Sequence, residues 1–204
     1  ATGLPYWLAG GYGTPDQFVA AREQGAAGVQ VGTVFALSAE SGMRSELRES
    51  MLRSLADGTL DVRTDGRASP TGFPFKVVQQ DGTVADPVVV GQRERICDLG
   101  YLRTPFERED GSVGYRCPSE PVDAFVKKGG DVAETEGRLC LCNGLLATAG
   151  HAQRRPASGG LTEEPPLLTL GQDLDGARDL QARYPDGWSA AQVVAWLMGD
   201  LART

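Results

Sequence analysis

The first 58 residues alternate short apolar runs with amphipathic stretches, and this alternation strongly limits the folds open to the chain. Residues 6–9 are apolar and are closed by a pair of glycines, which is typical of a buried strand. A helix start follows. Thr14 is suited to the N-cap, Pro15 to the first helical position, and Gln17 is placed to complete a capping box with Thr14. The pattern therefore predicts a strand and then a helix that ends near Gly25.

The same pattern repeats directly afterwards. A second strand is predicted at residues 28–32, and a further helix begins near Ser38 and ends at Gly58. Apolar side chains recur along this helix at helical spacing and form one stripe: Met43, Leu47, Met51, Leu52 and Leu55. Because strands that alternate with helices pair in parallel, the region predicts two βα units of an α/β fold.

Glycines follow both predicted strands, with Gly10, Gly11 and Gly13 after the first and Gly32 after the second. A glycine backbone can approach an anion closely, and exposed N–H groups at a helix start attract negative charge. In (β/α)8 barrels the loops after the last two strands commonly form a phosphate site in this way. Tight turns also use such glycines, so the spacing alone leaves both interpretations open.

Two segments resemble the last two strands of the nitronate monooxygenase family, which are FMN-dependent TIM barrels formerly called 2-nitropropane dioxygenases. The segments are LAGG at residues 8–11 and GAAGVQVGT at residues 25–33. Residues 40–42 are also similar to that family, and residues 67–76 are similar to a larger bacterial branch of it. The resemblance implies that residues 1–58 are the last two βα units of a (β/α)8 TIM barrel.

The resemblance also implies a cofactor site, because the family holds the FMN phosphate in the loops after these two strands. The first loop would donate backbone N–H groups from Gly10 and Gly11. The second loop would close the other side of the phosphate with Gln30, Val31, Gly32 and the hydroxyl of Thr33. The implied function is that of an FMN-dependent oxidoreductase acting on a small-molecule substrate. A flavin-dependent enoyl-acyl-carrier-protein reductase has similar phosphate loops and is the alternative enzyme.

The family's catalytic base is a histidine that follows a central barrel strand, and no segment of this sequence matches that region. Two strands cannot close a barrel that needs eight. We therefore expect an N-terminal barrel half, supplied as a second chain or as a cleavage product, to carry the base. The single histidine, His151, lies beside a glycine and three residues before Arg154, a setting typical of a loop. We do not expect His151 to be the base.

All four cysteines fall in one region, at Cys97, Cys117, Cys140 and Cys142. Disulfides are unusual in the cytosol, and four thiolates can hold zinc or an iron–sulfur cluster. The Cys-x-Cys pair is tighter than the usual C-x2-C spacing, however. A shared metal site, buried or reactive thiols, and disulfides all stay open. A metal site would also suit a third kind of function, that of a metal-stabilised, non-catalytic assembly subunit.

Residues 59–152 are expected to form an irregular extension, because glycine, proline, aspartate and arginine are frequent there and apolar runs are short. The predicted pieces are strands at 75–78 and 88–90, turns at 80–83 and 109–112, and a short helix at 121–128. Three arginines in this extension could bind an anionic substrate or simply be solvated: Arg67, Arg103 and Arg116.

Residues 153–204 are expected to be a connector followed by C-terminal helices that pack on the barrel. One helix is predicted at residues 171–184, and Ser189 with Gln192 forms the capping box of another. Val193, Leu197 and their neighbours give this last helix an apolar side for docking.

The formal net charge of −7 argues against a nucleic-acid partner that is bound through phosphate neutralisation. The sequence has no apolar run near the roughly 20 residues that cross a bilayer, and no basic start followed by an apolar stretch. We therefore expect a cytoplasmic protein that has no membrane partner.

Overall fold

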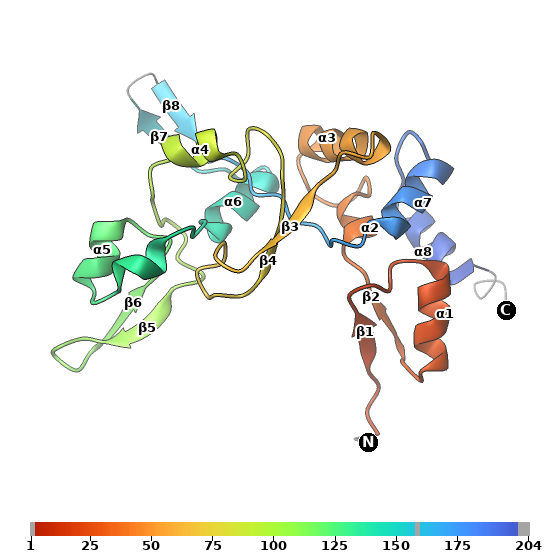
Figure 1. Ribbon diagram of the computed structural model, residues 1–204, viewed down its shortest axis with the longest axis horizontal. Helices are drawn as coiled ribbons and strands as arrows, with labels where there is room; N and C mark the ends of the chain where they lie inside the picture. The colour runs from red at the N-terminus through yellow and green to blue at the C-terminus, as the bar shows by residue number, and fades with distance from the viewer. Residues whose placement is uncertain (1–2, 158–159, 200–204) are drawn as a thin grey trace. The chain divides into compact units, whose positions relative to one another are not determined.

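The computed structural model describes residues 3–157 and 160–199, which divide into two compact units. The first unit contains the described residues up to position 60 and from position 170 onward. The second unit contains the described residues between positions 61 and 169. Each unit has its own short strands and helices (Figure 1).

The first unit contains one parallel strand pair and five helices among its described residues. They are β1 (Trp7–Ala9), α1 (Pro15–Glu23), β2 (Gly28–Gln30), α2 (Thr33–Ala36), α3 (Ser45–Ala56), α7 (Asp175–Arg183) and α8 (Ala190–Met198). Trp7 pairs with Gly28 and Ala9 with Gln30, so α1 is the crossover of a βαβ unit. This confirms the predicted alternation and the parallel pairing.

Both predicted capping boxes are present. The Thr14 hydroxyl accepts a hydrogen bond from the Gln17 N–H, and the Gln17 side chain accepts one from the Thr14 N–H at 2.9 Å. Ser189 and Gln192 form the same reciprocal pair at the start of α8. Two of the helix starts are therefore fixed by local side-chain chemistry.

The prediction that residues 6–9 form a buried strand is wrong about burial. Leu8 is half-buried, but the other apolar side chains of β1 and of the segment before it are exposed, with Leu4 71 %, Tyr6 44 % and Trp7 54 % exposed. Within the described residues β2 is the one strand that pairs with β1. Parallel strands are normally covered on both faces by other elements. A sheet of only two strands is too small to cover its own apolar side chains.

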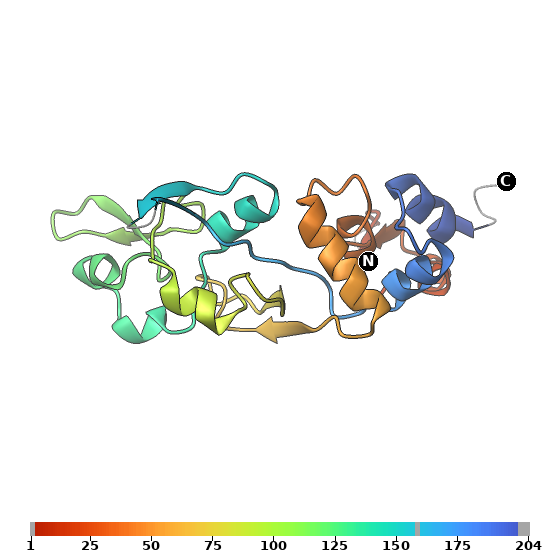
Figure 2. The ribbon, with the colours of Figure 1, turned by 90° about the horizontal axis from the view of Figure 1, so that it is seen from above.

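The core of the first unit lies among its helices. The predicted stripe of α3 buries Leu47, Met51 and Leu55, and Figure 2 shows α3 beside α7. The Trp188 indole N–H donates to the Val34 carbonyl at 2.7 Å in this core. The helix expected from Ser38 begins seven residues later than predicted, at Ser45.

The second unit contains three antiparallel strand pairs and short helices. Its strands are β3 (Val62–Asp65), β4 (Phe75–Val78), β5 (Thr104–Glu107), β6 (Val113–Arg116), β7 (Arg154–Ala157) and β8 (Gly160–Glu163). Its helices are α4 (Pro87–Gln92), α5 (Val122–Lys127), the 3-10 helix η1 (Val132–Thr135) and α6 (Leu141–Thr148). The predicted strand at 75–78, the two turns and the short helix near 121–128 are confirmed.

The predicted strand at residues 88–90 is wrong, because these residues lie in α4. The Asp86 carboxylate accepts a hydrogen bond from the Val88 N–H at 2.9 Å, and Pro87 occupies the first helical position. A side-chain cap and a proline at this position favour a helix over the β-preference of three valines.

The fold is therefore a mixed α/β arrangement with small separate sheets. The described residues contain no closed barrel, and the larger (β/α)8 barrel stays a prediction. None of the helices in the described ranges is long and apolar enough to span a bilayer.

Candidate functional site

The glycines singled out as phosphate ligands lie in two loops at one edge of the parallel strand pair. Gly10 and Gly11 follow β1, and Val31 and Gly32 follow β2. Because the strands are adjacent and parallel, both loops leave the sheet at its carboxyl edge (Figure 1). This is the edge at which α/β proteins bind ligands.

Bare backbone faces open space in both loops. A Cβ atom built on Gly10 or Gly32 would find no other atom within 4 Å. At Gly11 the nearest atom would be the Asp173 Oδ2, at 3.9 Å. Gly10 and Gly11 have φ angles of +77° and +82°, which L side chains rarely adopt, so the first loop depends on glycine.

The second loop is tied to the segment that leads into α7. The Thr33 hydroxyl oxygen accepts a hydrogen bond from the Gly171 N–H at 2.8 Å. Its hydrogen is left available to donate to an anion. Gln30, the last residue of β2, is exposed, whereas Val31 is half-buried.

A glycine that the sequence analysis did not single out supports the first loop. A Cβ on Gly176 would lie 2.0 Å from the Gly13 carbonyl oxygen and 3.2 Å from the Trp196 ring. The start of α7 can therefore touch the glycine loop only because residue 176 has no side chain. An isolated glycine at a helix start carries no signal of this contact in the sequence.

A carboxylate lies beside the first loop. The Asp173 carboxylate lies close to Gly11 and accepts a hydrogen bond from the Asp175 N–H at 3.1 Å. Its negative charge opposes an anion beside Gly11. Gly10, Gly32 and Thr33 are therefore the better placed donors for a phosphate.

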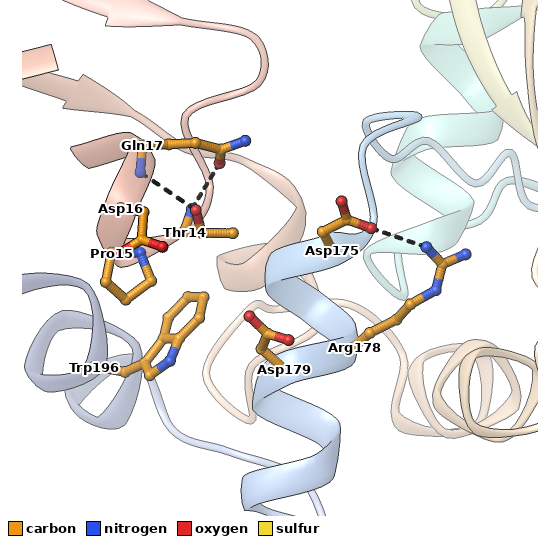
Figure 3. A pocket seen from close by; sticks show the side chains of 8 residues that line it. All are labelled: Thr14, Pro15, Asp16, Gln17, Asp175, Arg178, Asp179 and Trp196. Carbon is orange, nitrogen blue, oxygen red and sulfur yellow. Dashed lines mark hydrogen bonds and ion pairs between the residues drawn. The ribbon is translucent and has the colours of Figure 1, made fainter. Parts of the chain in front are cut away.

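A hollow of about 520 Å³ lies between the start of α1 and the helices α7 and α8 (Figure 3). Its lining comprises Thr14, Pro15, Asp16, Gln17, Asp175, Arg178, Asp179 and Trp196. The lining contains three carboxylates and one guanidinium, and the guanidinium of Arg178 already pairs with Asp175 at 3.1 Å. The hollow is thus unsuited to an anion and does not include the glycine loops.

The four cysteines all lie in the second unit as free thiols. Cys117 and Cys140 are buried, and Cys97 and Cys142 are half-buried. Burial raises the pKa of Cys117 and raises that of Cys140 to about 11. Among the described residues no three His, Cys, Asp or Glu side chains stand in an arrangement that could hold a metal ion.

The histidine and the arginines that the sequence suggested all lie in the second unit. His151 is exposed after the end of α6. Arg67 pairs with Glu136 at 3.1 Å, and the Arg116 guanidinium lies 5.0 Å from the centre of the Phe106 ring. These contacts join parts of the second unit to one another.

The sequence analysis missed the most buried charge of the second unit. Glu164 is 2 % exposed and accepts hydrogen bonds from Arg93 at 2.7 Å and from Arg155 at 2.8 Å. Arg155 also pairs with Asp98. Arg93 lies far from Glu164 in the sequence, so no local pattern reveals this network.

Comparison of the chain with protein families, with curated proteins and with solved structures gave no match.

Proposed function

We propose that the first unit holds the phosphate of FMN and belongs to an FMN-dependent oxidoreductase similar to nitronate monooxygenase. The observation that carries this proposal is the position of two glycine loops at the carboxyl edge of adjacent parallel strands. The resemblance of residues 8–11 and 25–33 to that family implies that these loops bind the phosphate.

Two properties of the loops favour a phosphate. Gly10 and Gly32 border open space, so a phosphate placed there could accept from their N–H groups and from that of Thr33, and the Thr33 hydroxyl would add a further donor. Glycine at positions 10 and 32 lets an anion approach the backbone without meeting a Cβ. Asp173 opposes this binding, and the proposal places the phosphate away from it.

The exposed face of β1 supports a further part of the proposal, namely an N-terminal barrel half as partner. Tyr6 and Trp7 present large apolar surfaces on a strand with a single neighbour in the described residues. Parallel sheets are buried on both faces, so additional strands from a second polypeptide would cover these side chains. The catalytic base would belong to that partner.

The chain's own contribution to the reaction is therefore binding and orientation. The two loops would fix the phosphate end of the cofactor and so set the position of its ring in the completed barrel. FMN, when bound, supplies the capacity to accept electrons from a small organic substrate.

Replacing Gly32 by leucine tests the phosphate site. The backbone at Gly32 has a φ angle of −106°, which any residue can adopt, and a Cβ there meets no neighbour. The variant should therefore fold while its side chain fills the space proposed for the phosphate. We expect the dissociation constant for FMN to rise at least about tenfold, which corresponds to about 1.4 kcal/mol. Quenching of flavin fluorescence measures this constant.

Gly91→Leu is the matched control, because Gly91 in α4 also faces open space and lies in the second unit. It should bind FMN as the wild type does, and the wild type should bind FMN more tightly than riboflavin, which lacks the phosphate. Equal binding of FMN by Gly32→Leu and wild type, or no preference for FMN over riboflavin, would overturn the proposal.

A further inference from the structure

A short segment in front of α7 lies beside both glycine loops. This linking segment, residues 170–174, belongs to the first unit. Near its start the Gly171 N–H donates to the Thr33 hydroxyl of the second loop at 2.8 Å. Near its end the Asp173 carboxylate lies close to Gly11 of the first loop. The linking segment therefore borders the proposed phosphate site, although it contains none of the predicted phosphate ligands.

The linking segment is fixed in its place within the first unit. Leu170 and Leu174, at its two ends, are buried. The Asp173 carboxylate accepts a hydrogen bond from the Asp175 N–H, which ties the segment to the first turn of α7. The helix α7 in turn lies against α2, which begins with Thr33 (Figure 1). Gly171 is thus held firmly enough to orient the side chain that it contacts.

The contact between Gly171 and Thr33 leaves no room for a side chain at position 171. A Cβ atom built there would lie 2.8 Å from the Thr33 Oγ1, which is too close unless one of the two atoms moves. The other atom found within 4 Å is the Asp173 carbonyl oxygen, at an ordinary contact distance of 3.9 Å. Gly171 does not have a positive φ angle, so its backbone conformation is open to other residues. Glycine at position 171 therefore provides room for the Thr33 hydroxyl.

The hydrogen bond from Gly171 determines how the Thr33 hydroxyl is presented. A threonine side chain in a helix divides between two rotamers, so its hydroxyl needs a partner to fix its direction. The Gly171 N–H supplies this partner. Because the Thr33 oxygen accepts from an N–H, its own hydrogen points elsewhere and can donate to an anion. An anion bound there would strengthen the bond from Gly171, since hydrogen bonds in a chain polarise one another.

We propose that Gly171 is a positioning residue of the phosphate site. Its N–H orients the Thr33 hydroxyl toward the phosphate, and its lack of a side chain leaves room for this orientation. The inference rests on the proposed function, because it requires that Thr33 donates to the FMN phosphate. Gly171 acts only through Thr33. The site then consists of three chain segments, namely the two glycine loops and the linking segment.

Gly171→Ala tests the inference with a small change. The new Cβ should displace the Thr33 hydroxyl, which can rotate by about 120° to another staggered rotamer. Because only a side chain has to move, the variant should melt close to the wild-type temperature. We expect its dissociation constant for FMN to rise about tenfold, as for the loss of a hydrogen bond to a charged group. The dissociation constant for riboflavin, which lacks the phosphate, should stay the same.

A double-mutant cycle with Thr33→Ala separates positioning from general damage. Thr33→Ala removes the hydroxyl and should weaken FMN binding about as much as Gly171→Ala does. In the Thr33→Ala background, Gly171→Ala should have no further effect, because the hydroxyl that it displaces is absent. Gly91→Ala is the matched control and should bind FMN as the wild type does, since its Cβ meets no neighbour. Equal weakening by Gly171→Ala in both backgrounds, or unchanged binding in the single variant, would overturn the inference.

The amide signal of Gly171 reports on the hydrogen bond itself. In the ¹⁵N-labelled wild type, FMN but not riboflavin should shift this signal, because a phosphate at Thr33 strengthens the bond. In Thr33→Ala the Gly171 amide hydrogen should exchange faster with solvent, and FMN should no longer shift its signal. A Gly171 amide that exchanges equally fast in both proteins, or that FMN shifts equally in both, would contradict the positioning role.

These outcomes distinguish the inference from the proposed function. If the wild type binds FMN no better than riboflavin, the phosphate site is wrong and the inference fails with it. If the wild type prefers FMN and Gly32→Leu weakens its binding, but Gly171→Ala does not, the phosphate site stands and Gly171 has no positioning role. Weaker FMN binding in Gly171→Ala, with no further loss in the double variant, supports both.

Discussion

Glu164 shows how one buried side chain can organise several loops of the second unit. Its carboxylate lies between Arg93, which belongs to the segment after α4, and Arg155 of β7. Arg155 also forms an ion pair with Asp98. The Asp98 carboxylate in turn accepts a hydrogen bond from the Asn143 side chain at the start of α6. The network therefore reaches the segments that carry Cys97 and Cys142.

Glu164→Gln should destabilise the second unit strongly, because it leaves two guanidinium groups facing a neutral amide. Breaking a buried ion pair by removing one partner costs about 3–5 kcal/mol. The neighbouring substitution Glu163→Gln is the control, since the Glu163 pair with Arg154 is exposed and is worth about 1 kcal/mol or less. Urea unfolding followed by circular dichroism measures both free energies of unfolding. A similar decrease in the free energy of unfolding in both variants would show that the Glu164 ion pairs stabilise the fold no more than the exposed Glu163 pair does.

At the scale of elements, Gly176 determines how closely α7 approaches the first glycine loop. Alanine normally stabilises a helix relative to glycine by up to about 1 kcal/mol. Here the new Cβ would overlap the Gly13 carbonyl oxygen at 2.0 Å, so the helix or the loop must move. The two effects have opposite signs, which makes the substitution informative.

We expect Gly176→Ala to lower the free energy of unfolding of the first unit by about 1–3 kcal/mol, the usual cost of overpacking. Gly91→Ala in α4 meets no neighbour and should instead stabilise the chain slightly. Thermal melts of the two variants beside the wild type give the comparison. A higher melting temperature in both variants would mean that α7 does not pack closely against the first glycine loop.

Local chemistry explains which elements the sequence could predict. The capping boxes at Thr14 and Ser189 and the apolar stripe of α3 depend on residues within a few positions of one another, and all are found. At residues 88–90 two local signals compete, and the cap at Asp86 with Pro87 outweighs the valines. The late start of α3 is also local, because the Ser38 hydroxyl and N–H both bond back to the Phe35 carbonyl and end α2.

Properties that depend on distant contacts could not be predicted in the same way. The sequence indicated that residues 6–9 form a strand, but their exposure depends on which strands lie beside them. The glycine loops were identified from their residues, whereas the support from Gly176 and the opposing charge of Asp173 come from distant positions. Likewise the hydrogen bond from the Ser119 hydroxyl to the Leu139 carbonyl joins residues that are 20 positions apart.

At the scale of the whole molecule, the chain consists of two compact units. The first unit has two glycine loops at the carboxyl edge of a sheet whose strands lack further neighbours in the described residues, and we propose that it completes a flavin-binding barrel. The second unit contains the four free cysteines and the buried ion pairs of Glu164, and the phosphate proposal does not depend on it.

The central claim is the phosphate site, and backbone amide mapping by NMR tests it most directly. The chain labelled with ¹⁵N is titrated with FMN and, in parallel, with riboflavin, and even weak binding shifts the amide signals next to the ligand. We predict that FMN, and not riboflavin, shifts the amides of Gly10, Gly32 and Thr33. Absence of FMN-specific shifts there, or shifts confined to the acidic hollow around Asp175 and Trp196 or to the second unit, would contradict the account.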